Sequence, residues 1–287
     1  MRFAWTALAL SVSTVSAGPI LFSIGGNDFG QPVRVTSIDV GASTATPLFD
    51  LQSDTAGFSG LTYRALDNLF FAVEFDGTDS TLVSISPGGG GAFSPVMTLV
   101  DPSSLVPLAF NGGLVYDPND GYFYAMANDS QGRSNLYRID SVGMTVQRLT
   151  TELPFSFNGG ITLNPDGTID AIRNDADGNS IVYKFTLSTN SAALSLLFGS
   201  SIGTGFYGGL AFGDDSNFYA LGSDIFGAAA IDTINDGNAN GLFGVGNGFL
   251  NAGLTEGPSA APEPSTLMLA AGALAILCGF QKFRRKQ

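Results

Sequence analysis

Short apolar and aromatic runs separated by turn residues fill most of this chain, and one such phrase is repeated along it. The phrase is clearest at Gly113-Leu114-Val115-Tyr116, which an Asp- and Pro-containing turn and the aromatic run 122–125 follow. Copies begin at successive spacings of 53, 47, 49 and 44 residues, at Gly60, Gly113, Gly160, Gly209 and Gly253. A fixed period of roughly 20 to 50 residues is typical of repeat architectures.

Each repeat predicts four short strands joined by tight turns. Asp, Asn, Pro and Gly in the turns either preset φ or tolerate left-handed backbone. We expect third strands at 82–86, 136–140, 181–186 and 229–232, and fourth strands at 96–100, 146–149, 194–198 and 242–245. Four hairpin-connected strands per repeat form the blade of a β-propeller. An open solenoid or an irregular β-sandwich is the alternative.

The first blade lacks an inner strand in front of it. Residues 20–24, 33–40 and 47–51 have the pattern of strands two, three and four, and the missing strand is expected at 253–255. Pairing of the N- and C-terminal segments would close the ring and leave no sheet edge unpaired. The sequence therefore predicts an all-β fold over residues 18–257: a β-propeller of five four-stranded blades closed by its two ends.

Both ends of the chain carry export signals. A basic start, the apolar run 3–12 and the small residues 15–17 predict a secretory signal peptide over 1–17. At the other end, a linker over 258–266 precedes the apolar run 267–280 and the basic tail 281–287. The run would rise about 21 Å as a helix, short of the roughly 30 Å hydrocarbon core. Basic residues stay on the cytoplasmic side, so we expect the large domain to face outward.

This C-terminal segment resembles the PEP-CTERM sorting signal, because Pro262, Glu263 and Pro264 precede a short apolar segment and an Arg-rich end. The resemblance implies processing by an exosortase, export across the inner membrane of a Gram-negative bacterium, and delivery to the cell envelope or an exopolysaccharide matrix. Many such signals carry Val where this chain has Ala261. The alternative is a plain C-terminal membrane anchor.

The charge of the chain fits an exported protein and excludes nucleic acid as a partner. The formal net charge is −13, and five of the twelve basic residues lie in the predicted signal and tail, which leaves −18 on the exported part. Such a surface repels phosphates. Cys278 lies in the apolar anchor, so no disulfide is expected in the domain. The chain has no His, which excludes Ser-His-Asp and Cys-His triads and favours hard cations over zinc.

One candidate site is positional. The residues two before each inner-strand glycine are expected at the mouth of the channel, where amides and aromatic rings bind a sugar or a cation. These residues are Phe58, Asn111, Asn158, Tyr207 and Asn251. The alternative is that Asn merely suits the turn into the inner strand.

A second candidate is a calcium loop. Asp236, Asn238 and Asn240 alternate with small residues, and Gly241 occupies the sixth position, but Asn247 stands where a bidentate Glu is expected. A plain hairpin turn is the alternative. Calcium is the one cofactor that this reading admits.

The repeated phrase is similar to that of NHL and SMP-30-like propellers, which run Gly-Leu-x-apolar, a turn, then an aromatic strand. Some members of that superfamily are calcium-dependent lactonases with Glu, Asn and Asp ligands, but Glu74, Glu152 and Glu256 do not repeat at a channel position. We therefore expect an exported, non-catalytic binding or structural module of the envelope or matrix. The alternative is a calcium-dependent hydrolase or lactonase with its site at the channel mouth.

Overall fold

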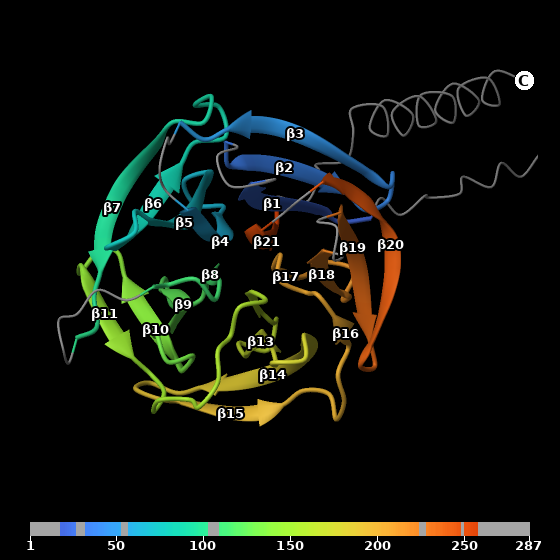
Figure 1. Cartoon of the computed structure of the whole chain (residues 1–287). Coiled ribbons are helices and arrows are strands. Elements are labelled where there is room, and N and C mark those ends of the chain that lie inside the picture. Colours follow the sequence, from blue (N-terminus) through green and yellow to red (C-terminus); the bar gives the residue numbers. More distant parts are fainter. Residues whose placement is uncertain are drawn as a thin grey trace, which may run out of the picture.

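The strands form a ring of five antiparallel sheets around a central axis (Figure 1). The computed structural model describes residues 18–26, 32–52, 57–102, 109–223, 228–247 and 250–257. In four of the sheets four strands follow one another along the chain, and one of these sheets carries a short additional strand; the fifth sheet combines strands from both ends of the domain. The predicted all-β, five-bladed propeller is confirmed.

The blades are numbered from the N-terminus, and their strands run from the inner to the outer edge. They are blade 1, β21 (Leu250–Glu256), β1 (Ile20–Gly26), β2 (Arg34–Asp39) and β3 (Thr44–Asp50); blade 2, β4 (Gly57–Arg64), β5 (Leu69–Phe75), β6 (Ser80–Ile85) and β7 (Phe93–Leu99); blade 3, β8 (Leu114–Tyr116), β9 (Phe123–Asn128), β10 (Ser134–Asp140) and β11 (Thr145–Arg148); blade 4, β12 (Ile161–Leu163), β13 (Ile169–Asn174), β14 (Asn179–Leu187) and β15 (Ala192–Leu196); blade 5, β17 (Leu210–Phe212), β18 (Phe218–Ser223), β19 (Ala228–Asn235) and β20 (Asn238–Asn247).

The two ends of the domain pair with each other in blade 1. Strand β21 lies antiparallel to β1, with Ser23 opposite Leu254 and Ile24 opposite Gly253. Figure 1 shows this last strand beside the first one at the centre of the ring. The C-terminal segment thus supplies the inner strand that the first repeat lacks, as predicted.

The hydrophobic core lies between the blades. Every residue of β9 is buried, whereas the outer strands β3 and β15 are mostly exposed. An inner or second strand is covered on both faces by neighbouring blades, so its sequence is a continuous apolar run rather than an alternating one. Buried clusters fill the spaces between adjacent blades, for example around Phe123 between blades 2 and 3 and around Phe157 between blades 3 and 4.

The outer edge of blade 4 differs from the prediction. Strand β15 ends at Leu196, before the expected end at 198, although the Leu197 amide still donates to the carbonyl of Val182. The chain then turns back, and the short strand β16 (Gly203–Thr204) pairs with β14 at Asn179 and Ser180. A fifth strand therefore covers part of the edge of this sheet.

The predicted signal peptide, linker, apolar segment and basic tail lie outside the described residues. Within the described part of the chain, no helix has the length and apolar character needed to cross a membrane. The sorting residues Pro262, Glu263 and Pro264 belong to the same undescribed segment, so their role stays a prediction.

Candidate functional site

Five glycines bring the inner strands together at the centre of the ring. A Cβ added to Gly60 would lie 2.5 Å from the amide nitrogen of Leu114, and one added to Gly113 would lie 2.7 Å from that of Ile161. The cycle continues from Gly160 to Gly209, then to Gly253, and returns to Gly60, and each added Cβ would meet backbone of the next strand. Four of the five glycines also have positive φ. No side chain fits at these positions, which explains why the repeats share glycine there.

Polar side chains hold the connection into the inner strand of blade 4. The amide group of Asn128 in blade 3 donates from Nδ2 to the carbonyl oxygen of Phe157 at 2.7 Å, and its Oδ1 accepts from the Phe157 N–H at 3.1 Å. The Ser134 hydroxyl donates to Asn128 Oδ1 and accepts from the same N–H at 2.9 Å. Phe157 lies outside the strands, so this serine–asparagine clamp satisfies its backbone N–H and carbonyl groups, which would otherwise be buried unpaired.

The same clamp recurs at the next junction. Asn174 of blade 4 donates from Nδ2 to the carbonyl oxygen of Phe206 at 3.0 Å, and the Phe206 N–H donates to Ser180 Oγ at 3.3 Å. The Ser180 hydroxyl donates to Asn174 Oδ1. A phenylalanine is thus held by its backbone and buried by its ring, with Phe157 and Phe206 at most 5% exposed.

A variant of the clamp joins blades 2 and 3. The Phe110 N–H donates to Ser80 Oγ at 3.2 Å, and the Ser59 hydroxyl donates to the Phe110 carbonyl at 2.5 Å. At the two junctions that flank blade 1 the corresponding residues cannot form it. Val33 between blades 1 and 2 and Ala229 between blades 5 and 1 occupy the position of the serine and carry no hydroxyl group.

The clamps fix which way the two entrance asparagines point. Each Nδ2 hydrogen of Asn128 has an assigned acceptor, because one goes to the Phe157 carbonyl and the other to Asn111 Oδ1 at 2.6 Å. The backbone groups of Phe157 leave no freedom to exchange the ends of the Asn128 amide. The Asn111 atom that accepts this hydrogen bond must therefore be the side-chain oxygen Oδ1, and Asn111 Nδ2 points away from Asn128.

The same reasoning applies one blade further on. Asn158 Oδ1 accepts one hydrogen bond from Asn174 Nδ2 at 2.9 Å and another from the backbone N–H of Asn174 at 3.3 Å. Asn111 is exposed and Asn158 is partly buried. At both entrances the amide oxygen faces the protein and the amide NH₂ is left for a ligand or water, so the pair offers hydrogen-bond donors in equivalent positions of adjacent blades.

The other three predicted mouth residues are placed differently. Phe58 is 3% exposed and packs edge-to-face on Phe93 with ring centroids 5.2 Å apart, so it belongs to the core between blades 1 and 2. Tyr207 is partly buried beside the entrance of blade 5, and its N–H donates to the carbonyl of Gly205 at 3.1 Å. Asn251 lies in β21, and its side chain is outside the described residues.

The predicted calcium-loop residues lie on a two-residue hairpin. Asn235 pairs with Asn238, and the residues between them, Asp236 and Gly237, have φ of 50° and 79°. Two successive residues at positive φ are typical of a type I′ turn, for which Asp-Gly is a favoured pair. Asn238 Nδ2 donates to the Asp236 carbonyl at 3.4 Å, and Asn240 lies opposite Thr233 in the ladder. Calcium binding by Asp236, Asn238 and Asn240 stays a prediction.

Carboxylates near the inner strands have raised pKa values without forming a cluster. Burial is the main cause for Glu74, at the end of β5, and Asp76 adds to it. Burial also raises the pKa of Asp170 in β13 to about 6, partly opposed by Asn164 and Lys184. Among the described residues no three His, Cys, Asp or Glu side chains gather closely enough to hold a metal ion.

The clamp residues themselves were missed in the sequence. Two of the clamps share a seven-residue pattern, Asn-Asp-x-x-Gly-x-Ser, at 128–134 and 174–180. Its middle part forms the turn between the second and third strands, where the carboxylate of Asp129 or Asp175 accepts backbone N–H groups. The pattern repeats after 46 residues, which is a signal that could have identified the clamp.

No family model matches this chain, and no curated protein matches it either. Solved structures do resemble it. They include the nidogen/laminin complex, with a TM-score of 0.54 at 13% identity over 83% of this chain and 82% of that one, and TolB from Acinetobacter baumannii, with 0.53 at 10% over 82% and 66%. The gluconolactonase XC5397 from Xanthomonas campestris has a TM-score of 0.50 at 13% identity over 81% of this chain and 79% of that one. At these identities the likeness shows the fold alone, a propeller that resembles those of gluconolactonases and of binding proteins.

Proposed function

We propose that the propeller is a non-catalytic binding module that recognises a neutral, oxygen-rich polymer such as a polysaccharide. The observation that carries the proposal is the direction of the amides at the entrances of blades 3 and 4. Asn111 and Asn158 each bind the protein through Oδ1 and turn Nδ2 away from it. Sugar hydroxyl and ring oxygens accept hydrogen bonds from such groups.

The neighbouring entrance adds an aromatic ring. Tyr207 occupies in blade 5 the position that Asn111 and Asn158 occupy in blades 3 and 4, two residues before the central glycine. An aromatic face beside amide donors suits the apolar face of a sugar ring, since Tyr combines a large hydrophobic surface with a polar hydroxyl. In this proposal, three adjacent blades supply two amide donors and one ring to the same ligand.

The place of action follows from the ends of the chain. We propose export through the signal peptide at 1–17, sorting at Pro262, Glu263 and Pro264 by an exosortase, and residence in the envelope or exopolysaccharide matrix of a Gram-negative bacterium. The net charge of −18 on the exported part supports this place, because an acidic surface stays soluble and avoids anionic surfaces.

Calcium-dependent hydrolysis at the mouth is the second function. It would require the Asn111 and Asn158 carbonyl oxygens to face the ligand, because calcium takes oxygen ligands. Those oxygens accept hydrogen bonds from Asn128 and Asn174 instead. Replacing the two asparagines by aspartate separates the two functions, since a metal site needs the amide oxygen and a sugar site needs the NH₂ group.

Isosteric substitution tests the donors directly. In Asn111→Asp and Asn158→Asp the inward oxygen that accepts from the clamp is kept, and the outward NH₂ becomes an oxygen. We expect the double variant to melt like the unaltered domain and to lose retardation in affinity electrophoresis through dextran, mannan or galactan gels. Asn190→Asp, in the exposed turn that leads into β15, is the matched control. Retention of the double variant equal to that of the control would contradict the proposal.

A further inference from the structure

Two of the described arginines, Arg138 and Arg173, form no ion pair, and Arg173 also has a buried nitrogen without a partner in the described part of the chain. Arg173 is the next-to-last residue of β13, and Asn174, which holds Asn158, is the last. Successive side chains of a strand point to opposite faces. Arg173 therefore faces blade 3, on the side where Phe155 and Tyr183 pack, whereas Asn174 faces blade 5.

The guanidinium of Arg173 sits in an aromatic setting. Its Cζ lies 4.4 Å from the centroid of the Phe155 ring, and Nη1 donates to the Tyr183 hydroxyl at 3.5 Å. The rings of Phe155 and Tyr183 stack with centroids 5.4 Å apart at an interplanar angle of 30°. Nε is buried and has no hydrogen-bond partner among the described residues. A planar cation is thus oriented by rings while part of its donor set is unused.

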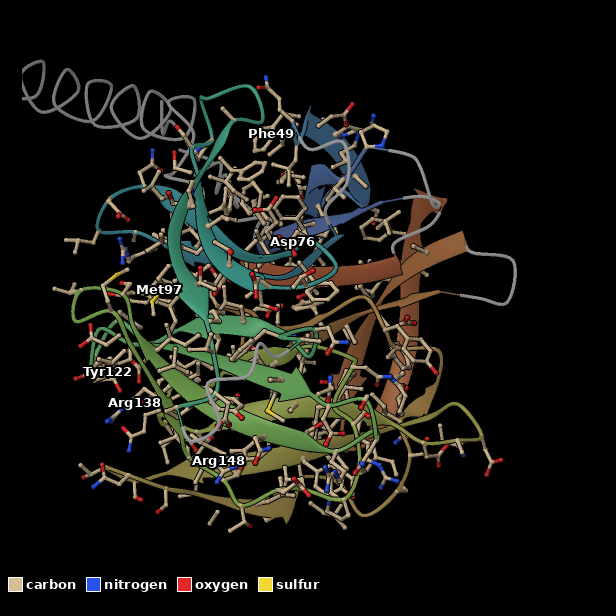
Figure 2. All side chains as sticks on the ribbon, turned by 60° about the vertical axis from the view of Figure 1, so that its left-hand side comes forward. Phe49, Asp76, Met97, Tyr122, Arg138 and Arg148 are labelled. Carbon is tan, nitrogen blue, oxygen red and sulfur yellow. The ribbon has the colours of Figure 1, made fainter. Side chains whose placement is uncertain are left out.

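The other described arginines interact with charged or amide side chains. Four of them pair with carboxylates: Arg34 with Asp50, Arg64 with Asp67, Arg133 with Asp129 and Glu152, and Arg148 with Asp101. Arg138 Cζ lies 4.6 Å from the centroid of the Tyr122 ring, and Nη2 donates to Gln147 Oε1 at 2.5 Å. Figure 2 labels Arg138 and Tyr122 in the same region of the molecule. Arg173 also lowers the pKa of the Asp175 carboxyl group through space, and its effect is the smallest of those that lower it.

We propose that Arg173, with Phe155 and Tyr183, binds the carboxylate group of an acidic ligand, and that an acidic sugar such as a uronate is the ligand class. The guanidinium fork matches the two oxygens of a carboxylate, and a charge-assisted pair is stronger than a neutral hydrogen bond. The Tyr183 hydroxyl accepts from Nη1, so its own hydrogen remains available to a second ligand oxygen. Phe155 keeps the guanidinium plane in place and limits its rotamer freedom before binding.

This carboxylate site is separate from the entrance donors, because Arg173 and the Asn174–Asn158 pair lie on opposite faces of β13. Its chemistry also differs, since it requires a negative charge on the ligand. An acidic polysaccharide could meet both sites, and either site can fail alone.

Calorimetric titration tests the site with defined probes: sodium galacturonate, galactose as its neutral counterpart, N-acetylalanine as a peptide-type carboxylate, and inorganic phosphate, all at one ionic strength. We expect galacturonate to bind, galactose to bind at least about tenfold more weakly, and Arg173→Gln to reduce galacturonate affinity at least about tenfold. Arg138→Gln, which removes another ring-stacked arginine, should bind galacturonate normally.

Each outcome decides the matter. Loss of galacturonate binding in Arg173→Gln but not in Arg138→Gln supports the site, and tighter binding of galacturonate than of N-acetylalanine assigns it to a sugar acid. Equal binding of galactose, tighter binding of phosphate or of N-acetylalanine, or undiminished binding in Arg173→Gln would overturn the inference. Arg173→Lys is a second variant, in case Arg173→Gln misfolds, because it keeps the positive charge but loses the planar guanidinium group. Its affinity for galacturonate should fall between that of the unaltered domain and that of Arg173→Gln. The Asn111→Asp, Asn158→Asp variant should bind galacturonate normally, so failure of the entrance proposal leaves this result readable.

Discussion

The three clamped junctions between blades 2, 3, 4 and 5 are held together differently from the two junctions that flank blade 1. Side-chain hydrogen bonds from Ser and Asn fix the connecting phenylalanines at the clamped junctions. At the two junctions of blade 1, Val33 and Ala229 stand at the positions of the clamp serines, and the ring is closed within blade 1 by the β1–β21 ladder. Every blade has such a ladder between its inner and second strands, so blade 1 differs in that its ladder joins the two ends of the chain and in that its junctions lack the serine of the clamp.

The difference shows at which positions the fold requires a particular side chain. A ladder depends on strand length and register and accepts many side chains, whereas a clamp needs Asn or Ser at fixed places. The repeated phrase is accordingly strongest in the clamped blades, with Phe-Asn-Gly-Gly at 110–113 and 157–160, and weakest at 250–253. The entrance donors belong to the clamped part, where the same asparagines that fasten blades also orient Asn111 and Asn158.

The largest effect on stability is expected from a substitution at Gly253, where the last inner strand meets the inner strand of blade 2. In Gly253→Val the added side chain would meet the backbone of Gly60 and Leu61, which has no room to move without separating blades 1 and 2. We expect a loss of roughly 3 kcal/mol or more in the free energy of unfolding, the upper range for overpacking. Thermal melting checks this against Gly199→Ala, where an added Cβ meets no atom within 4 Å. Equal melting temperatures would show that the backbone seam is dispensable.

The next effect concerns the buried acid of blade 4. Asp170 occupies a position that is aromatic in blades 2, 3 and 5, at Phe71, Tyr124 and Tyr219, and it is fully buried. Its pKa is raised from 3.8 to about 6 by burial, with Lys184 lowering it and Asp166 raising it. The folded state therefore binds the proton more tightly than the unfolded one, and stability falls as the pH rises through this interval.

Asp170→Asn removes that titration. We expect the variant to be more stable at pH 7 by about 2 to 3 kcal/mol, since each pKa unit corresponds to about 1.4 kcal/mol, and to differ little from the unaltered domain at pH 4. Urea unfolding at pH 4, 5, 6 and 7 measures the difference. An unaltered domain whose stability does not decline between pH 4 and 6 would contradict the assignment.

Breaking one clamp should have a smaller effect. Asn128→Ala leaves the Phe157 carbonyl without its partner, and an unsatisfied buried group costs about 1 to 3 kcal/mol. Asn111→Ala removes an exposed side chain that accepts one hydrogen bond from Asn128 but keeps both bonds of Asn128 to Phe157, so it should cost less, about 0.5 to 1 kcal/mol. Urea unfolding of both variants compares a clamp residue with the residue that it orients. Equal losses would mean that the clamp contributes no more than a surface contact.

Calcium should have the smallest effect. The amide oxygens at the entrances of blades 3 and 4 are already used, and Asp236 lies in a type I′ turn. We expect millimolar calcium to raise the melting temperature by less than about 1 °C, because only a ligand of the folded state stabilises it. A larger shift that disappears in Asp236→Ala would establish the turn as a calcium site, and one that disappears in Asn158→Ala would favour the hydrolase function.

The fold could be predicted because it depends on local, repeated features. The glycine period, the turn residues and the missing first strand each have a direct structural cause, and the closure through residues 253–255 followed from them. Strand ends were less well predicted, as at Leu196, because they depend on hydrogen bonds from elsewhere in the blade.

The site could be predicted only in part. Position relative to the glycine located Asn111 and Asn158, yet the same offset in blade 2 holds Phe58, whose ring gains more from burial than from exposure at the mouth. The direction of each amide depends on Asn128 and Asn174, which belong to the following strand. That dependence is visible only when hydrogen-bond donors and acceptors are counted in three dimensions.

The glycine contacts at the axis also limit how this protein can evolve. Each of the five glycines touches the backbone of the next inner strand, and the last touches the first. A duplicated repeat would enlarge the circle and separate every pair at once, and a lost repeat would leave the ends too far apart to pair. The number of repeats is therefore fixed at the centre of the molecule, while insertions in the loops between strands remain tolerable because they leave the circumference unchanged.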